Sequence, residues 1–148
     1  MAARDKDTVN LTIMVFTGQP VDYMKFRHVG IECYFVSQAY RTFFHSKGRE
    51  TTRYTVEERP HYDGATSLRF ARSVVVGQLQ TQMTRAEVQT LMFGIDPDNI
   101  DGERCQAWVG RVLTTLVEQG LLLAHEVDTA IDGMVSAIVE ARDEDQAE

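Results

Sequence analysis

The chain has 148 residues, with 15 Lys and Arg against 22 Asp and Glu, which gives a formal net charge of −7. Hydrophobic residues make up 43% and charged residues 25%, proportions typical of one globular domain that exclude a collagen, a coiled coil and a disordered chain. The acidic balance argues against a nucleic-acid partner and against docking on anionic lipid, because both demand a basic patch. Without an apolar run of about 20 residues, no membrane span is expected.

The N-terminal residues carry charges where a secretory signal would have its apolar core, so we expect a cytoplasmic protein. Its two cysteines are not expected to form a disulfide in that compartment. The Cys and His spacings match no zinc motif, so we expect neither a metal nor another cofactor. We expect a polar lead-in over residues 1–8, a single α+β domain over residues 9–141 and an acidic tail over residues 142–148.

The first half of the chain is rich in β-branched and aromatic residues that alternate with polar ones. Strands are predicted over residues 9–16, 26–36, 51–58 and 68–79. The segment 37–50 stays ambiguous, because its aromatic residues give way to polar ones around a glycine.

The second half changes to the 3.6-residue period of helices. Thr84 begins a capping box for a short helix, which Gly94 is placed to end. Two further helices are predicted over residues 102–119, with Gly120 as C-cap, and over residues 127–141. Strands first and helices afterwards are typical of an α+β fold, so we expect an antiparallel sheet of about four to five strands followed by three helices.

One cysteine lies near the start of a predicted helix. If Asp101 caps that helix, Cys105 falls in its first turns, where partial positive charge and free N–H groups stabilise a thiolate. The neighbouring Arg104 acts in the same direction, and a thiolate so placed is a plausible nucleophile. By spacing alone, such a cysteine is more often a small buried hydrophobe, and Cys33, in the middle of a predicted strand, is interpreted in that way.

A cysteine nucleophile needs a base, and His28 is the natural candidate among the four histidines. It lies in a predicted strand that could pack against the Cys105 helix. His45 and His61 are less attractive, because they lie in an ambiguous segment and in a turn. Trp108 is interpreted as core packing.

Two blocks together resemble a known superfamily. They are Arg27-His28-Val29-Gly30-Ile31 and Arg104-Cys105-Gln106-Ala107-Trp108-Val109. A histidine strand that precedes a cysteine helix resembles the circularly permuted branch of the papain-like superfamily, which includes NlpC-type enzymes, PPPDE-type desumoylating isopeptidases and relatives of lecithin–retinol acyltransferase. The chain is similar above all to small uncharacterised fungal proteins with a Cys-Gln-x-Trp helix, over about residues 9–123.

The resemblance implies a permuted papain-like fold in which Cys105 is the nucleophile and His28 the base. Backbone N–H groups at the start of the helix would hold the oxyanion, with Arg104 and Gln106 beside the substrate.

The family's third polar residue lies on the strand that follows the histidine strand, which here is the strand predicted over residues 51–58. Either Thr55, Glu57 or Glu58 orients the imidazole, or no residue does. Glu57 and Glu58 cannot act on one atom, because neighbouring strand residues point to opposite faces, and by default both are interpreted as solvated.

We therefore expect a cysteine-dependent hydrolase or acyltransferase that acts on an amide, ester or thioester bond of a small-molecule or peptide-like substrate. Two alternatives stay open. One is a biosynthetic cyclase or isomerase of small molecules that uses the same pocket without an acyl intermediate. The other is a non-catalytic binding module or homodimer, in which the amphipathic last helix would contact a partner instead of its own core.

Overall fold

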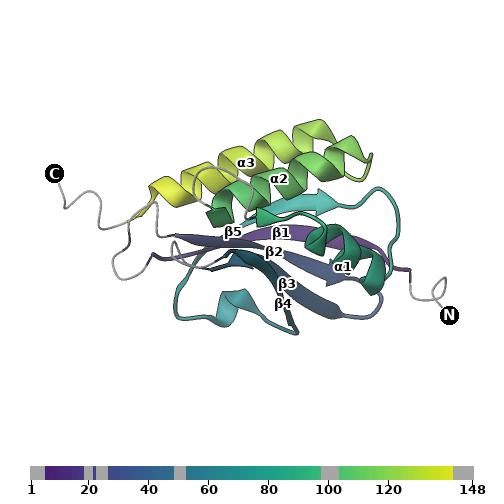
Figure 1. Ribbon diagram of the computed structural model, residues 1–148, viewed down its shortest axis with the longest axis horizontal. Coiled ribbons are helices and arrows are strands. Elements are labelled where there is room, and N and C mark those ends of the chain that lie inside the picture. The colour runs from purple at the N-terminus through teal and green to yellow at the C-terminus, as the bar shows by residue number, and fades with distance from the viewer. Residues whose placement is uncertain (1–5, 19–21, 23–26, 49–52, 98–103, 142–148) are drawn as a thin grey trace.

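The computed structural model describes residues 6–18, 22, 27–48, 53–97 and 104–141 (Figure 1). Five strands are described: β1 (Val9–Phe16), β2 (His28–Phe35), β3 (Tyr40–Lys47), β4 (Thr55–Pro60) and β5 (Phe70–Gln78). The helices are α1 (Arg85–Phe93), α2 (Arg104–Glu118) and α3 (Ala124–Val139), with a short 3-10 helix, η3 (Gly64–Thr66). The expected α+β architecture is confirmed, with strands first and helices afterwards.

The five strands form one antiparallel sheet in the order β4-β3-β2-β1-β5. The first three strands each pair with the next one along the chain, as sequential strands usually do. β5 instead returns to the free edge of β1, so the segment between β4 and β5 crosses from one edge of the sheet to the other. This crossing carries η3 and lies on the face of the sheet opposite the helices (Figure 1).

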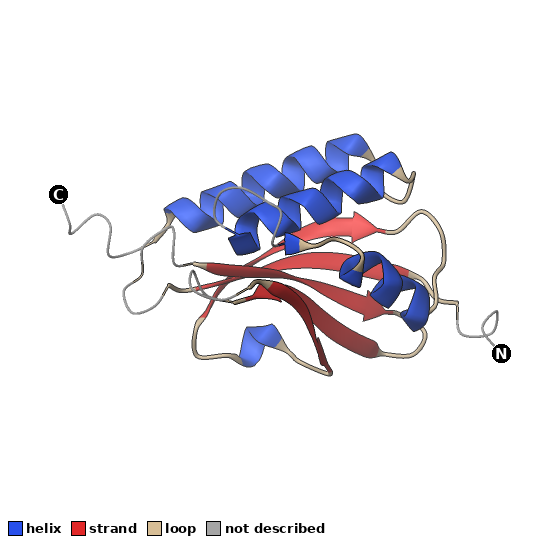
Figure 2. Ribbon diagram, in the orientation of Figure 1, coloured by secondary structure: helices blue, strands red, loops and turns tan. Residues whose placement is uncertain are grey.

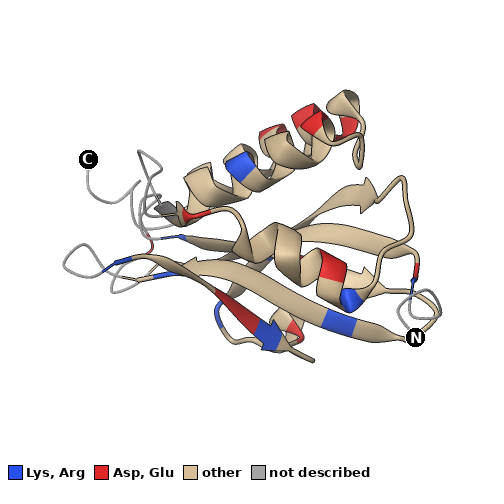
Figure 3. Ribbon diagram, turned by 45° about the vertical axis from the view of Figure 1, so that its right-hand side comes forward, with Lys and Arg blue, Asp and Glu red and all other residues tan. Residues whose placement is uncertain are grey.

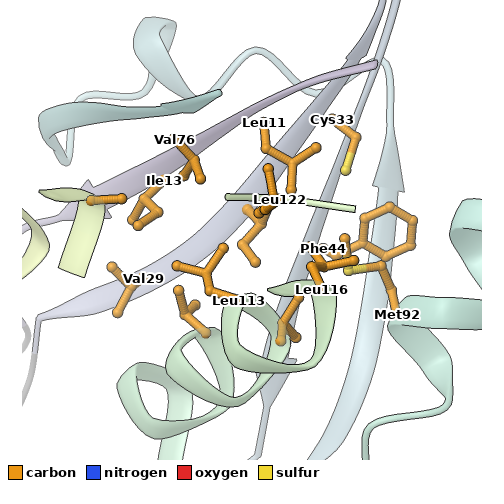
Figure 4. Close-up of a cluster of buried hydrophobic side chains, with 14 of the residues drawn as sticks. Leu11, Ile13, Val29, Cys33, Phe44, Val76, Met92, Leu113, Leu116 and Leu122 are labelled. Carbon is orange, nitrogen blue, oxygen red and sulfur yellow. The ribbon is translucent and has the colours of Figure 1, made fainter. Parts of the chain in front are cut away.

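The main core lies between the sheet and the helices, and α2 and α3 run side by side across that face (Figure 2). Alternate residues of β2, among them Val29 and Ile31, are fully buried there because successive strand side chains point to opposite faces. Leu113 and Leu116 of α2 pack against them (Figure 4). Trp108 is also fully buried, and its indole N–H donates to the carbonyl of Ile95 at 2.8 Å, which confirms that it is a core residue.

A second, smaller apolar cluster covers the opposite face. Met14, Phe16 and Phe43 are its buried members, and Tyr62 and Phe70 pack against them. The η3 segment lies on this side of the sheet (Figure 1). Its Gly64 contacts the cluster, because an added Cβ would lie 3.0 Å from the Phe16 ring. Both faces of the sheet are therefore covered, one by helices and the other by a loop.

The predicted helix caps are largely confirmed. Thr84 and Glu87 form the reciprocal capping box before α1. Gly120 has a φ of 72°, the left-handed geometry that a glycine C-cap favours. Gly94 ends α1 as expected but keeps helical backbone angles, with φ −75°. The third helix begins at Ala124, three residues before the predicted start, because Glu126 caps its own first turn through the Leu123 N–H.

Two predictions need correction. The strand missing from the sequence reading is β3, which occupies the segment left ambiguous. Glu57 and Glu58 do point to opposite faces, but they are not solvated, since both are half-buried and hydrogen-bonded.

In the predicted polar lead-in, Asp7 is buried and accepts the backbone N–H groups of Ser37 and Gln38. No helix in the described ranges is both long and apolar enough to cross a membrane.

Candidate functional site

Three polar side chains from three neighbouring strands form a hydrogen-bonded chain at one end of the sheet. The Nε2 atom of His28 on β2 lies 2.7 Å from Nδ1 of His45 on β3. The Nε2 atom of His45 in turn lies 2.7 Å from Oε1 of Glu57 on β4. His45 and Glu57 are directly opposite in the strand register, and His28 is the diagonal neighbour of His45, two residues before its partner Gly30. Diagonal partners lie within reach of ring side chains.

The surroundings of His28 and His45 keep both imidazoles neutral at pH 7. Burial, with the nearby His45 acting in the same direction, lowers the pKa of His28 from 6.5 to about 4. Burial also lowers the pKa of His45, although its hydrogen bond to Glu57 opposes the shift. The hydrogen bond from His45 lowers the pKa of the Glu57 carboxyl, which is therefore ionised.

These charge states determine which atom donates in each of the two hydrogen bonds. A carboxylate can only accept, so His45 donates its Nε2–H to Glu57 and carries a lone pair on Nδ1. That lone pair accepts the Nε2–H of His28, which leaves the Nδ1 atom of His28 as the basic nitrogen. His28 is thus held in the tautomer that can take up a proton at Nδ1, with a carboxylate at the far end to stabilise the resulting positive charge.

A pocket of about 400 Å³ opens beside the two histidines, on the face of the sheet away from α2 and α3. The volume falls in the range of small-molecule sites. One wall is aromatic, formed by Phe16 and Phe43. The remaining lining comes from Thr17 and from polar side chains on β4 and on the crossing between β4 and β5, namely Arg59, Tyr62, Ser67 and Arg69.

Cys105 lies near this end of the sheet, at the second residue of α2. Its thiol is 3.7 Å from the carbonyl oxygen of Arg27, the residue directly before His28. The side-chain amide of Gln106 donates to the same oxygen at 3.3 Å. The start of the cysteine helix and the start of the histidine strand are therefore in contact.

The two side chains of the predicted dyad face different ways. Cys105 packs against the main core on the helical side, whereas His28 lines the pocket on the other side. No hydrogen bond joins the described His28 ring to the described Cys105 thiol. Two further predictions lie outside the described residues: Asp101 as the helix cap, and the side chain of Arg104.

A buried ion pair fixes the start of β2. The guanidinium of Arg27 makes two bonds of 2.7 and 2.8 Å to the carboxylate of Asp22. It also donates to the carbonyl oxygens of Ala137 and Glu140 at the end of α3. Both side chains of the pair are only 4% exposed. The residue before His28 is therefore bound to the end of α3 and to Asp22, whose carboxylate also accepts the Gly18 N–H.

His45 is a member of the candidate site that the sequence analysis judged less attractive. The strand that follows the histidine strand is β3, not the strand predicted over residues 51–58, and His45 lies on it. A signal was present, since residues 40–45 read Tyr-Arg-Thr-Phe-Phe-His, a run with the composition of a strand. Cys33 is fully buried in β2, and burial raises the pKa of its thiol strongly, as expected for an inert cysteine.

Comparison with known proteins places the chain in a family. A family of unknown function, DUF6540, has a model that matches residues 19–123, and the chain belongs to this family. The matched range includes His28, His45, Glu57 and Cys105. No curated protein and no solved structure matches the chain.

Proposed function

We propose that this protein is a cysteine-dependent hydrolase or acyltransferase in which Cys105 is the nucleophile and His28 the base. One observation carries the proposal: His28, which is hydrogen-bonded to His45 and through it to Glu57, lies at the strand start that the cysteine helix touches. A base held in one tautomer by a second histidine and a carboxylate is the arrangement that activates a nucleophile in acyl transfer. The order of histidine strand and cysteine helix also supports the permuted papain-like class.

The proposed reaction uses the chain of three residues in order. The Nδ1 atom of His28 takes the proton from Cys105, and the sulfur attacks the carbonyl carbon of an amide, ester or thioester. The protonated His28 then gives its proton to the leaving group, and water or a second nucleophile releases the acyl group from the sulfur. His45 and Glu57 act as positioning residues, because they fix the His28 tautomer and stabilise its positive charge.

The reaction requires one change from the structure described here. Proton transfer needs the His28 nitrogen and the Cys105 sulfur within about 3–4 Å of each other. The Cys105 thiol already contacts the carbonyl oxygen of Arg27, the residue before His28, so the proposal requires both side chains to reorient around this end of the sheet when a substrate binds. The proposal thus predicts that the thiol responds to His28 even though no hydrogen bond joins them at rest.

A second candidate function is acid–base catalysis without a covalent intermediate, as in an isomerase or cyclase of small molecules. The observation that favours it is the lining of the pocket, which contains His28 and His45 while Cys105 packs on the other side of the sheet. A substrate in this pocket would meet the imidazoles first. The Cys105→Ser variant separates the two functions, since covalent catalysis would collapse and acid–base catalysis would survive.

Alkylation by iodoacetamide from pH 4 to 10 tests the proposed function without a known substrate. If His28 activates Cys105 as a neutral base, alkylation of Cys105 at pH 7 is faster than that of a free thiol, and His28→Ala abolishes the difference. Cys33 is an internal control, because its buried thiol should react only after unfolding. A Cys105 thiol that reacts in the same way with and without His28 would contradict the proposal.

A further inference from the structure

The pocket beside the histidines has a charge that the chain as a whole does not share. Two arginines, Arg59 and Arg69, line it, and none of its described lining residues is acidic. This is notable in a chain of net charge −7. Other arginines of the described chain pair with carboxylates, such as Arg41 with Asp63 and Arg72 with Glu140.

The two pocket arginines are free to bind a ligand. Neither forms an ion pair with a carboxylate among the described residues. The guanidinium of Arg59 lies over the Tyr62 ring, with Cζ 4.0 Å from the ring centre, and this contact holds the group beside the pocket. Acidic residues lie at the turn between α2 and α3, on the helical face of the sheet (Figure 3). The carboxylate of Glu57, next to the pocket residue His45, is paired with His45 and Lys47.

The rest of the lining is apolar or uncharged. The rings of Phe16 and Phe43 meet edge to face with centres 5.8 Å apart, and Tyr62 packs near both. An added Cβ on Gly30 would lie 2.2 Å from the Phe43 ring, so this residue must be glycine for the aromatic wall to lie flat on β2. The pocket therefore has an aromatic wall at one side and the guanidinium groups of two exposed arginines beside it.

We propose that this pocket binds a small organic anion that carries a carboxylate on an apolar, preferably aromatic, body. The planar fork of an arginine matches a carboxylate with two parallel hydrogen bonds, and the aromatic wall accepts the apolar part. The neutral imidazoles add hydrogen-bonding groups without excluding an anion. This inference deepens the proposed function, because it assigns the substrate class to the space that His28 faces.

Binding of phenylacetate, followed by calorimetry and by the imidazole NMR signals, tests the inference. We expect saturable binding that shifts the signals of His28 and His45 and leaves those of the exposed His125 unchanged. Uncharged phenylacetamide and inorganic phosphate, which lacks an apolar body, should each bind at least about tenfold more weakly.

Matched variants locate the anion. Arg59→Gln and Arg69→Gln should each weaken phenylacetate binding at least about tenfold, whereas Arg111→Gln on the exposed side of α2 removes the same charge and should leave it unchanged. No saturable binding, equal binding of phenylacetamide or phosphate, or equal losses in all three variants would overturn the inference. Cys105→Ser should bind phenylacetate like the natural chain, so failure of the thiol chemistry and failure of this site give different results.

Discussion

The neutral state of His28 makes the stability of this protein depend on pH in a range that can be calculated. Its pKa falls from 6.5 to about 4 on folding, so between these values the unfolded chain binds a proton that the folded chain does not. Stability is then fully present above pH 6.5 and is lost as the pH falls toward 4. From these two values, His28 removes about 2 kcal/mol between pH 7 and pH 5, and about 3 kcal/mol by pH 4.

The assay is urea unfolding at pH values from 4 to 8, with the natural chain beside His28→Gln. The variant lacks the titrating group, so its free energy of unfolding should fall by about 2–3 kcal/mol less across this range. The pKa of Glu57 is also lowered, so its protonation reduces the stability of both proteins at the acidic end of the range, and this contribution cancels in the comparison. His125→Gln, at an exposed site on α3, should follow the natural chain. Parallel curves for the natural chain and His28→Gln would refute the reasoning.

Three further predictions concern the framework of the site, each measured as the free energy of unfolding in denaturant. Gly30→Ala should cost about 1–3 kcal/mol because the new methyl group meets the Phe43 ring, whereas Gly110→Ala, with open space around it in α2, should stabilise by up to about 1 kcal/mol; equal effects would contradict the described packing. Arg27→Leu should cost about 3–5 kcal/mol, since it strands the buried Asp22 carboxylate, and the added change Asp22→Leu should restore part of the loss. Thr84→Ala should cost about 1 kcal/mol through the lost cap of α1, and no loss would argue against the capping box.

The sequence was sufficient for elements whose local signal agrees with their tertiary role. The strand over residues 9–16 alternates over its first half and is rich in β-branched residues, and the helix after Thr84 has its capping box, so both were predicted with the observed bounds. β3 was missed because it is buried on both faces and so lacks alternation between apolar and polar residues. The pairing of β3 with β2 and β4 depends on the order of strands in the sheet, which a local sequence pattern does not contain.

The residues of the candidate site also fall into two groups, those that a local pattern indicates and those that tertiary packing brings together. Cys105 and His28 stood out because each lies at the start of an element, where a local pattern can be recognised. The role of His45 depends on the diagonal register between β2 and β3, and that of Glu57 on its pairing with β3. These contacts are set by tertiary packing, so residue types and spacing could not reveal the chain of three residues or the pocket beside it.

The central claim is that Cys105 carries an acyl group during catalysis with the help of His28. Incubation with p-nitrophenyl acetate followed by rapid acid quench and peptide mass spectrometry tests it most directly. The account predicts one acetyl group on Cys105, formed far more slowly in His28→Ala and absent in Cys105→Ser, with His125→Gln as an unaffected control. Acetylation spread over lysines, or a Cys105 adduct that forms equally fast without His28, would contradict the account.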